Sequence, residues 1–247
     1  VIDTLKEAKL KDFIIVTGPH EDFIKSYFGD GSRLGVSIRY AHQDKALGMA
    51  NAIQTTKDLV EDHFLVVNGD DMFDSSLIEK MNSEFRSDID LMLACKPTKE
   101  TWKYAVLKIS NGRVDRIIEK PSLGQEPSDL GVIGAYILPK KIFEYYDKVP
   151  LNDMQHELAI QKLIDDDNVV KAVNYDGYFS SYKFPWDLLE INRYLMDKLL
   201  TKPMIASDAK ISEKAEIIGN VWISSGVEVM GNVTIHGPCY IGENSLI

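Results

Sequence analysis

The segment Phe64-Leu65-Val66-Val67-Asn68-Gly69-Asp70-Asp71 decides the fold class of this chain. A run of apolar residues this short, closed by a polar turn, is typical of a strand that is covered on both faces. Ligand-binding residues of open α/β sheets lie just beyond the carboxyl ends of such strands. The segment therefore predicts a buried strand that places Asp70 in a binding site.

Strand and helix patterns alternate on both sides of this segment. The expected strands are residues 13–16, 36–40, 64–67 and 89–95, and the expected helices between them are 20–28, 49–60 and 77–85. This rhythm predicts an α/β domain with a doubly wound, mostly parallel, Rossmann-like sheet.

The pattern changes after residue 100. Asn111-Gly112 separates two strand-like runs, residues 104–109 and 114–118, and is a strong signal for a hairpin. A further strand is expected at residues 131–138, with Pro139 opening a helix at its first position. Two more helices are expected, at residues 157–164 and after Pro185.

A six-residue repeat occupies the end of the sequence. Its aliphatic positions are Ile211, Ile217, Ile223, Val229, Ile235, Ile241 and Ile247. This period is typical of a parallel β-helix. A β-meander with chance spacing is the alternative, and seven consecutive matches disfavour it. We expect an α/β domain at residues 1–200 and a β-helix of hexapeptide repeats at residues 201–247.

The composition excludes several classes of protein. The 28 basic and 38 acidic side chains give a net charge of −10, which disfavours binding to nucleic acid. The apolar runs are too short to cross a membrane. Cys95 and Cys239 do not make a disulfide framework, so a cytoplasmic location is expected.

Three short motifs carry groups that could bind a ligand. The Gln43 amide can meet a pyrimidine-like base at two points, with Gly48 admitting a flat ring; a plain polar loop is the alternative. Asp70 is placed to hold Mg²⁺ beside a triphosphate, whereas Asp71 and Asp74 fit a turn and a helix cap better. Glu119-Lys120 offers a hydroxyl acceptor and a cation for a sugar phosphate.

The order of these motifs resembles one family. Gln43 to Gly48, Gly69-Asp70, Tyr104-Ala105-Val106, Glu119-Lys120-Pro121 and Gly131-Val132-Ile133-Gly134-Ala135-Tyr136 are followed by hexapeptides. This order is similar to that of the sugar-1-phosphate nucleotidyltransferases, of the glucose-1-phosphate thymidylyl- or uridylyltransferase type. The likeness is to archaeal members with a left-handed β-helix tail, and it extends over essentially the whole sequence.

The resemblance implies a Mg²⁺-dependent enzyme that transfers a nucleotidyl group from UTP or dTTP to a sugar 1-phosphate and releases pyrophosphate. It implies glucose or N-acetylglucosamine as the sugar. From the short tail of seven hexapeptides we expect a homo-oligomer formed through the β-helix. It assigns nucleotide binding to Gln43, Gly48, Gly69 and Asp70, and sugar-phosphate binding to Tyr104, Glu119, Lys120, Val132 and Gly134. Asp70 is the implied metal ligand, and Asp70 and Lys120 are the implied catalytic residues.

The sequence also departs from the family. No Gly-rich triphosphate loop matches: residues 29–33 read as a connecting turn, and the first residues resemble the helix that follows that loop. Ser181 and Lys183 stand where the family has a second metal-binding Asp and a Gly, and Gln155 stands where it has a Glu. His156, beside apolar residues, is expected to be structural. These departures keep an alternative open, a catalytically weak or inactive homologue that binds a sugar nucleotide and acts in regulation.

Overall fold

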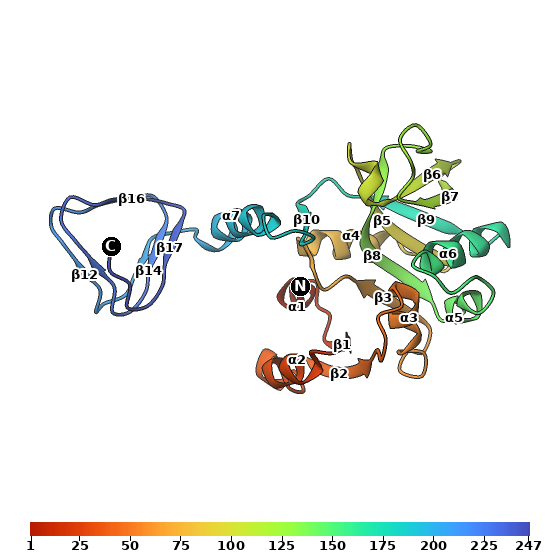
Figure 1. Cartoon of the computed structure of the whole chain (residues 1–247), viewed down its shortest axis with the longest axis horizontal. Helices are drawn as coiled ribbons and strands as arrows, with labels where there is room; N and C mark the ends of the chain where they lie inside the picture. Colours follow the sequence, from red (N-terminus) through yellow and green to blue (C-terminus); the bar gives the residue numbers. More distant parts are fainter. The chain divides into compact units, whose positions relative to one another are not determined.

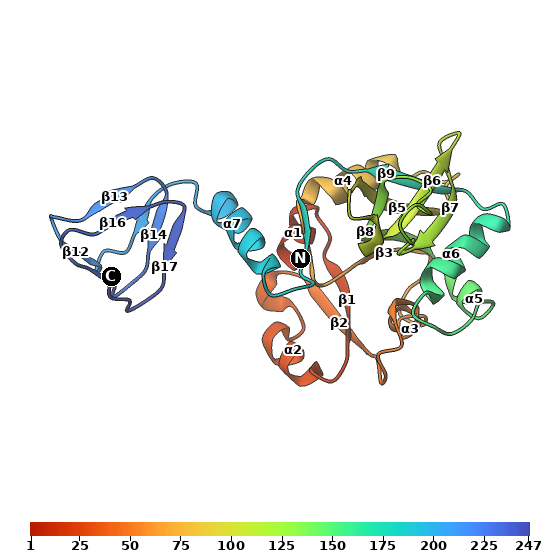
Figure 2. The same cartoon turned by 45° about the horizontal axis from the view of Figure 1, so that its top comes forward.

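The structure, a computed structural model, describes residues 1–247 and divides into two units, Val1–Phe179 and Ser180–Ile247 (Figures 1 and 2). In chain order the first unit contains α1 (Ile2–Glu7), β1 (Asp12–Thr17), α2 (Glu21–Phe28), η1 (Ser32–Leu34), β2 (Ser37–His42), α3 (Met49–Gln54), β3 (His63–Val67), β4 (Asp71–Phe73), α4 (Ser75–Glu84), β5 (Leu91–Pro97), η2 (Thr101–Lys103), β6 (Ala105–Ser110), β7 (Arg113–Glu119), β8 (Leu130–Pro139), α5 (Ile142–Tyr146), α6 (Gln155–Asp165) and β9 (Val170–Asn174).

The main sheet of the first unit is organised around the long strand β8. The strand order is β7-β6-β8-β5-β9, and β3 also pairs with β8. The pairs of β8 with β3, β5 and β6 are antiparallel, and only β5 and β9 are parallel. A separate two-stranded sheet joins β1 and β2 in parallel.

Helices cover both faces of the main sheet, because its central strands alternate between two cores. In β5, Leu91, Leu93 and Cys95 belong to the core beneath α3, α5 and α6. Met92 and Ala94 belong to the other core, which contains buried residues of α1 and α4. This alternation is the two-residue period of a strand buried on both faces. The α/β class expected from the sequence is thus the class of the first unit.

Three sequence-based expectations about this unit were wrong in detail. The main sheet is mixed, not mostly parallel, because β8 lies antiparallel between its neighbours. Pro139 does not open a helix but ends β8, opposite His63 at the start of β3. The helix expected at residues 49–60 ends at Gln54. The hydroxyls of Thr55 and Thr56 donate hydrogen bonds to the backbone carbonyls of Ala52 and Ile53. Such side-chain bonds compete with the backbone hydrogen bonds that would extend the helix.

Two turn predictions were confirmed. Asn111 and Gly112 both have positive φ and link β6 to β7 as a tight hairpin. Residues 29–33 connect α2 to β2 through η1, and the Asp30 carboxylate accepts a hydrogen bond from the Ser32 amide. Residues 29–33 therefore form a connecting turn, not a phosphate loop.

The second unit begins within β10 (Phe179–Ser181) and contains helix α7 (Asp187–Leu199) and seven short strands. The strands are β11 (Met204–Ile205), β12 (Lys210–Ile211), β13 (Glu216–Ile218), β14 (Val221–Ile223), β15 (Glu228–Val229), β16 (Thr234–His236) and β17 (Cys239–Ile241). The sequence placed the boundary after residue 200, whereas the structure groups α7 with the C-terminal segment. Of the α7 residues only Ile191 is buried, so the helix adds nothing to the two cores of the first unit.

The strands of the C-terminal segment pair in parallel with partners 18 positions along the chain. Met204 pairs with Trp222, Glu216 with Thr234, and Val221 with Cys239. This offset equals three of the hexapeptides, so the chain returns to the same side after every third repeat, as Figure 1 shows. The core inside the coil contains Val221, Ile223, Val227, Val229, Ile235 and Ile241, with Ile211 and Ile217 packed against it.

Candidate functional site

The carboxyl end of β3 forms the first part of the candidate site. The backbone amide of Asn68 donates to the backbone carbonyl of Gly134 at 3.0 Å, and the side-chain Nδ2 of Asn68 donates to Asp71 Oδ2 at 3.1 Å. A Cβ on Gly134 would lie 2.0 Å from Asp71 Oδ2 and 2.4 Å from Asn68 Nδ2, and Gly134 has a φ of +38°. Only glycine fits this position.

The acidic residues that follow β3 differ in how far they are exposed to solvent. Gly69 and Asp70 are exposed, whereas Asp71 is 3% exposed. Asp70 therefore presents a carboxylate to solvent. Asp71 is more than the turn residue that the sequence suggested, because its carboxylate is packed against Gly134. Asp74 occupies the N-cap position of α4, as expected.

The end of β7 forms the second part of the site. Ala105 pairs with Glu119, and the Lys120 amide donates to the carbonyl of Tyr104 at 3.1 Å, so the three predicted residues Tyr104, Glu119 and Lys120 lie together. The Lys120 ammonium is 3.2 Å from Glu119 Oε1, with side-chain exposures of 62% and 19%. The lysine side of this ion pair is open to solvent, so the pair adds little stability and leaves the Lys120 ammonium available to a ligand.

Val132 takes a different position from the one predicted. It is buried and belongs to the core that α3, α5 and α6 cover. Its side chain therefore packs within the protein, and only its backbone could touch a ligand. Of the two predicted residues on β8, Val132 and Gly134, only Gly134 lies against the polar residues of the β3 end.

The Gln43 loop forms the third part of the site. Gln43 Nε2 donates to the Gly48 carbonyl at 3.2 Å and to Asn51 Oδ1 on α3 at 2.9 Å. Both amide protons are thus used within the chain, and the two-point contact with a base expected from the sequence is reduced to one. The amide oxygen makes no hydrogen bond within the chain and can accept one from a ligand. Gly48, with φ +95°, approaches the segment before α6: its Cβ would lie 3.7 Å from the Cα of Asp153.

Helix α6 supplies ionisable groups that the sequence analysis did not place in the site. Burial and, to a smaller extent, the negative charge of Glu119 together raise the pKa of Glu157 to about 7. Tyr136, on β8, has its pKa raised by burial and then by the charges of Glu157, Glu119 and Asp71. The charges of Asp71 at the β3 end and of Glu119 at the β7 end therefore both act on Tyr136, which links the two parts of the site electrostatically.

The two residues before Glu157 are structural, as expected for His156. Tyr146 Oη lies 2.8 Å from His156 Nδ1, and burial lowers the pKa of His156 to about 3, which keeps the ring neutral. Gln155 is buried too, and its Nε2 donates to the carbonyl of Tyr146. Glu157, not Gln155, is the residue of this helix that faces Glu119. A glutamate in the first turn of a helix is common on surfaces, so the pattern gave no signal of this role.

Ser181 and Lys183 belong to the second unit. The Lys183 and Phe184 amides both donate to Asp187 Oδ2, at 2.8 and 2.7 Å, so Asp187 closes the turn that leads into α7. The Lys183 side chain is exposed.

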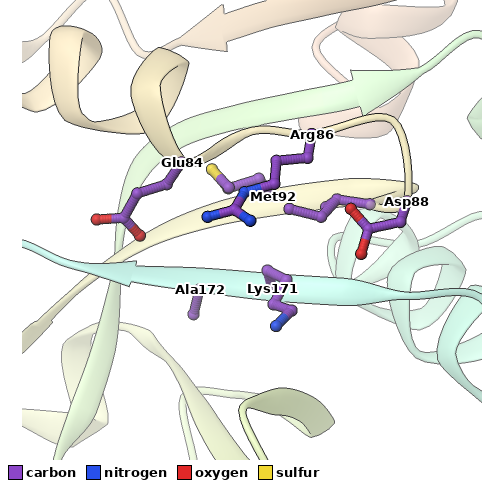
Figure 3. A pocket seen from close by; sticks show the side chains of 7 residues that line it. Glu84, Arg86, Asp88, Met92, Lys171 and Ala172 are labelled. Atoms are coloured by element: carbon purple, nitrogen blue, oxygen red, sulfur yellow. The ribbon is translucent and has the colours of Figure 1, made fainter.

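A hollow of about 340 Å³ lies elsewhere in the first unit (Figure 3). It is lined by Glu84, Arg86, Asp88, Ile89, Met92, Lys171 and Ala172. These residues lie near the amino ends of β5 and β9, whereas Asp70 follows the carboxyl end of β3. Both β3 and β5 run antiparallel to β8, so they point in the same direction. The hollow, at the amino end of β5, and the candidate site, at the carboxyl end of β3, therefore lie toward opposite ends of the strands.

Residues 1–192 match the Nucleotidyl transferase family model, so the chain belongs to the nucleotidyl transferase family. A glucose-1-phosphate thymidylyltransferase of Streptomyces griseus is 31% identical over 89% of this chain and 62% of that protein. The bifunctional protein GlmU of Methanocaldococcus jannaschii is 33% identical over 90% of this chain and 51% of its own length. The chain thus spans only about half to two thirds of the length of these two relatives.

Solved structures support the fold. A UDP-glucose pyrophosphorylase complexed with UDP-glucose superposes with a TM-score of 0.70 at 23% identity, over 80% of this chain and 85% of that one. In the structure of this chain, none of the helices combines the length and the apolar character that a membrane-spanning segment requires.

Proposed function

We propose that this chain transfers a nucleotidyl group from UTP or dTTP to a sugar 1-phosphate, glucose 1-phosphate or N-acetylglucosamine 1-phosphate, and releases pyrophosphate. The observation that carries the proposal is the convergence of the β3 end, the β7 end and Gly134 around Tyr136. The names of the relatives, a thymidylyltransferase and a UDP-glucose pyrophosphorylase, support the choice of substrates.

In the proposed reaction, an oxygen of the sugar phosphate attacks the α-phosphorus of the triphosphate in line, and pyrophosphate leaves. No covalent enzyme intermediate is needed, so positioning and charge neutralisation supply the catalysis. The Lys120 ammonium holds the sugar phosphate, and Glu119 accepts hydrogen bonds from sugar hydroxyls. Gln43 Oε1 accepts the ring N–H of uracil or thymine, which cytosine lacks at that position.

The residues present fit a magnesium ion bound with the help of substrate. No group of three or more His, Cys, Asp or Glu side chains is arranged to hold a metal by itself. Mg²⁺ usually takes one or two protein carboxylates together with substrate phosphates, so the exposed Asp70 is sufficient as the protein ligand. When bound, the ion would neutralise phosphate charge.

The test is pyrophosphate release from each of UTP, dTTP, ATP and GTP, in the presence of Mg²⁺ and glucose 1-phosphate. We expect release from UTP or dTTP, and its loss in Asp70→Asn. Asp62→Asn, an exposed carboxylate at the other end of β3, is the matched control and should retain activity. Equal release from all four nucleotides, or an Asp70→Asn protein as active as the control, would contradict the proposal.

One observation favours a second candidate, a homologue that binds a sugar nucleotide without efficient turnover. Ser181 provides no carboxylate where the family has a second metal-binding Asp, and Lys183 adds a positive charge where the family has a Gly. Such a protein would bind UDP-glucose but release pyrophosphate slowly. In that case the double change Ser181→Asp, Lys183→Gly should raise the rate, whereas an unchanged rate would remove the reason for this candidate.

For the C-terminal segment we infer a left-handed β-helix through which copies of the chain associate. The 18-residue offset between paired strands and the aliphatic interior support the β-helix. The outer side of β14 and β17 carries Trp222 and Tyr240, whose rings meet edge to face while remaining 39% and 55% exposed. Exposed aromatic pairs of this kind are typical of interfaces.

A further inference from the structure

Helix α6 lies along strand β7 in a register that its hydrogen bonds fix. Gln161 Oε1 accepts the backbone amide of Ile117 at 3.0 Å. Glu157 is one helical turn before Gln161 and lies on the same face of α6. Glu119 is two residues after Ile117 and lies on the same face of β7. The register therefore directs Glu157 toward Glu119, at the end of the strand where Lys120 begins.

The surroundings of Glu157 are unusual for a carboxyl group. The side chain is only partly exposed, and Glu119, itself 19% exposed, is the charged group that opposes its ionisation. Lys120 is the nearby group that favours it. The charge of Glu157 contributes to the raised pKa values of Tyr136 on β8 and of Tyr146 on α5, and the Tyr146 hydroxyl lies 2.8 Å from His156 Nδ1. Helix α3 contains no ionisable residue. His156 is neutral.

We propose that Glu157 is a specificity-determining residue of the sugar-phosphate subsite, where its carboxyl and that of Glu119 share one proton and bind neighbouring hydroxyl groups of a hexose 1-phosphate. The inference rests on the proposed function and identifies how its sugar is bound. A protonated carboxyl donates a hydrogen bond and an ionised one accepts it, so the pair matches a sugar diol.

The proposal makes the affinity for the sugar phosphate depend on pH in a defined direction. With one shared proton, the single negative charge of the pair is balanced by Lys120. When the proton is lost, the second carboxylate repels the incoming phosphate and no longer donates a hydrogen bond. Because the pKa of Glu157 is about 7, binding should weaken by up to about tenfold per pH unit above that value.

The experiment measures binding of glucose 1-phosphate and, separately, of UDP by calorimetry between pH 7 and 9, where the substrate phosphates are ionised. Glu157→Gln keeps a neutral donor and should make the glucose 1-phosphate affinity independent of pH. Glu157→Leu should weaken it at least about tenfold at pH 7. The control Glu144→Gln removes an exposed carboxylate from α5 and should retain the wild-type slope. Circular dichroism checks that each variant is folded.

The outcomes separate this inference from the proposed function. The inference is overturned if Glu157→Gln keeps the wild-type slope, if Glu157→Leu binds glucose 1-phosphate as tightly as wild type, or if no protein binds it. UDP binding should be the same in all four proteins, because the base is held at Gln43. If UDP binds to none of them while glucose 1-phosphate binds with the expected slope, the proposed function fails and the sugar subsite stands.

Discussion

Gly134→Ala is the substitution that tests the geometry of the β3 end most sharply. The added Cβ would lie 2.0 Å from Asp71 Oδ2 and 2.4 Å from Asn68 Nδ2, far inside contact distance. Neither side chain can move without losing a contact, because the Asn68 side chain donates a hydrogen bond to Asp71. The backbone amide of Asn68 also donates to the Gly134 carbonyl, which fixes the position of Asn68 relative to β8. The substitution therefore has to break the Asn68–Asp71 hydrogen bond or move β8.

The expected loss of stability has two sources. A residue with a Cβ costs about 1–2 kcal/mol when held in the left-handed region, where Gly134 has its φ of +38°. Breaking a hydrogen bond to a buried carboxylate costs about 1.5–3 kcal/mol. Together the free energy of unfolding should fall by about 2.5–5 kcal/mol, a large share of the total for a typical domain.

Urea unfolding, followed by circular dichroism, measures this loss. The control is Gly69→Ala, in the turn between β3 and β4, where φ is outside the left-handed region and a Cβ would meet nothing within 4 Å. The control should change stability by less than about 0.5 kcal/mol. If Gly134→Ala were as stable as Gly69→Ala, the close packing of Asn68, Asp71 and Gly134 would be refuted.

Three further predictions follow from the same structure. Between pH 4.5 and 6.5, the free energy of unfolding of Glu157→Gln should increase as the pH rises, because the unfolded chain binds a proton at His156 that the folded chain excludes. Over the same range the free energy of unfolding of His156→Asn should decrease as the pH rises, because folded Glu157 keeps a proton that the unfolded chain releases. Identical pH profiles for the two variants would contradict both pKa values. Gln43→Leu should weaken binding of UTP by about 1–3 kcal/mol in calorimetry and leave ATP binding unchanged; an equal loss for both nucleotides would exclude base recognition. Deleting residues 202–247 should lower the oligomeric state in light scattering while the first unit stays folded, and an unchanged assembly would exclude the C-terminal coil as the oligomerising element.

Much of the first unit could be predicted because its signals are local. Asn111-Gly112 fixed the hairpin, since a tight turn needs two residues with positive φ, and both have it. The apolar run before Asn68 gave β3 and the position of Asp70. The direction of β8 could not be predicted, because a strand buried on both faces has the same apolar pattern in a parallel and an antiparallel sheet.

The candidate site was predicted where its residues occur in short motifs and missed where the fold assembles it. Tyr104, Glu119 and Lys120 lie together as expected, because the hairpin joins them. Asp71 and Glu157 were missed, since their proximity to Gly134 and Glu119 depends on the register between distant elements. Val132 was included for its place in a motif, although the strand period buries its side chain.

The central claim, that the ends of β3 and β7, Gly134 and the Gln43 loop form one nucleotide-sugar site, is tested most directly by NMR titration with UDP-glucose and Mg²⁺. The account predicts that the backbone amide signals of Gly48, Gly69, Lys120 and Gly134 shift together with a single dissociation constant. Shifts confined to Arg86, Asp88 and Lys171, around the hollow near the amino ends of β5 and β9, would contradict it.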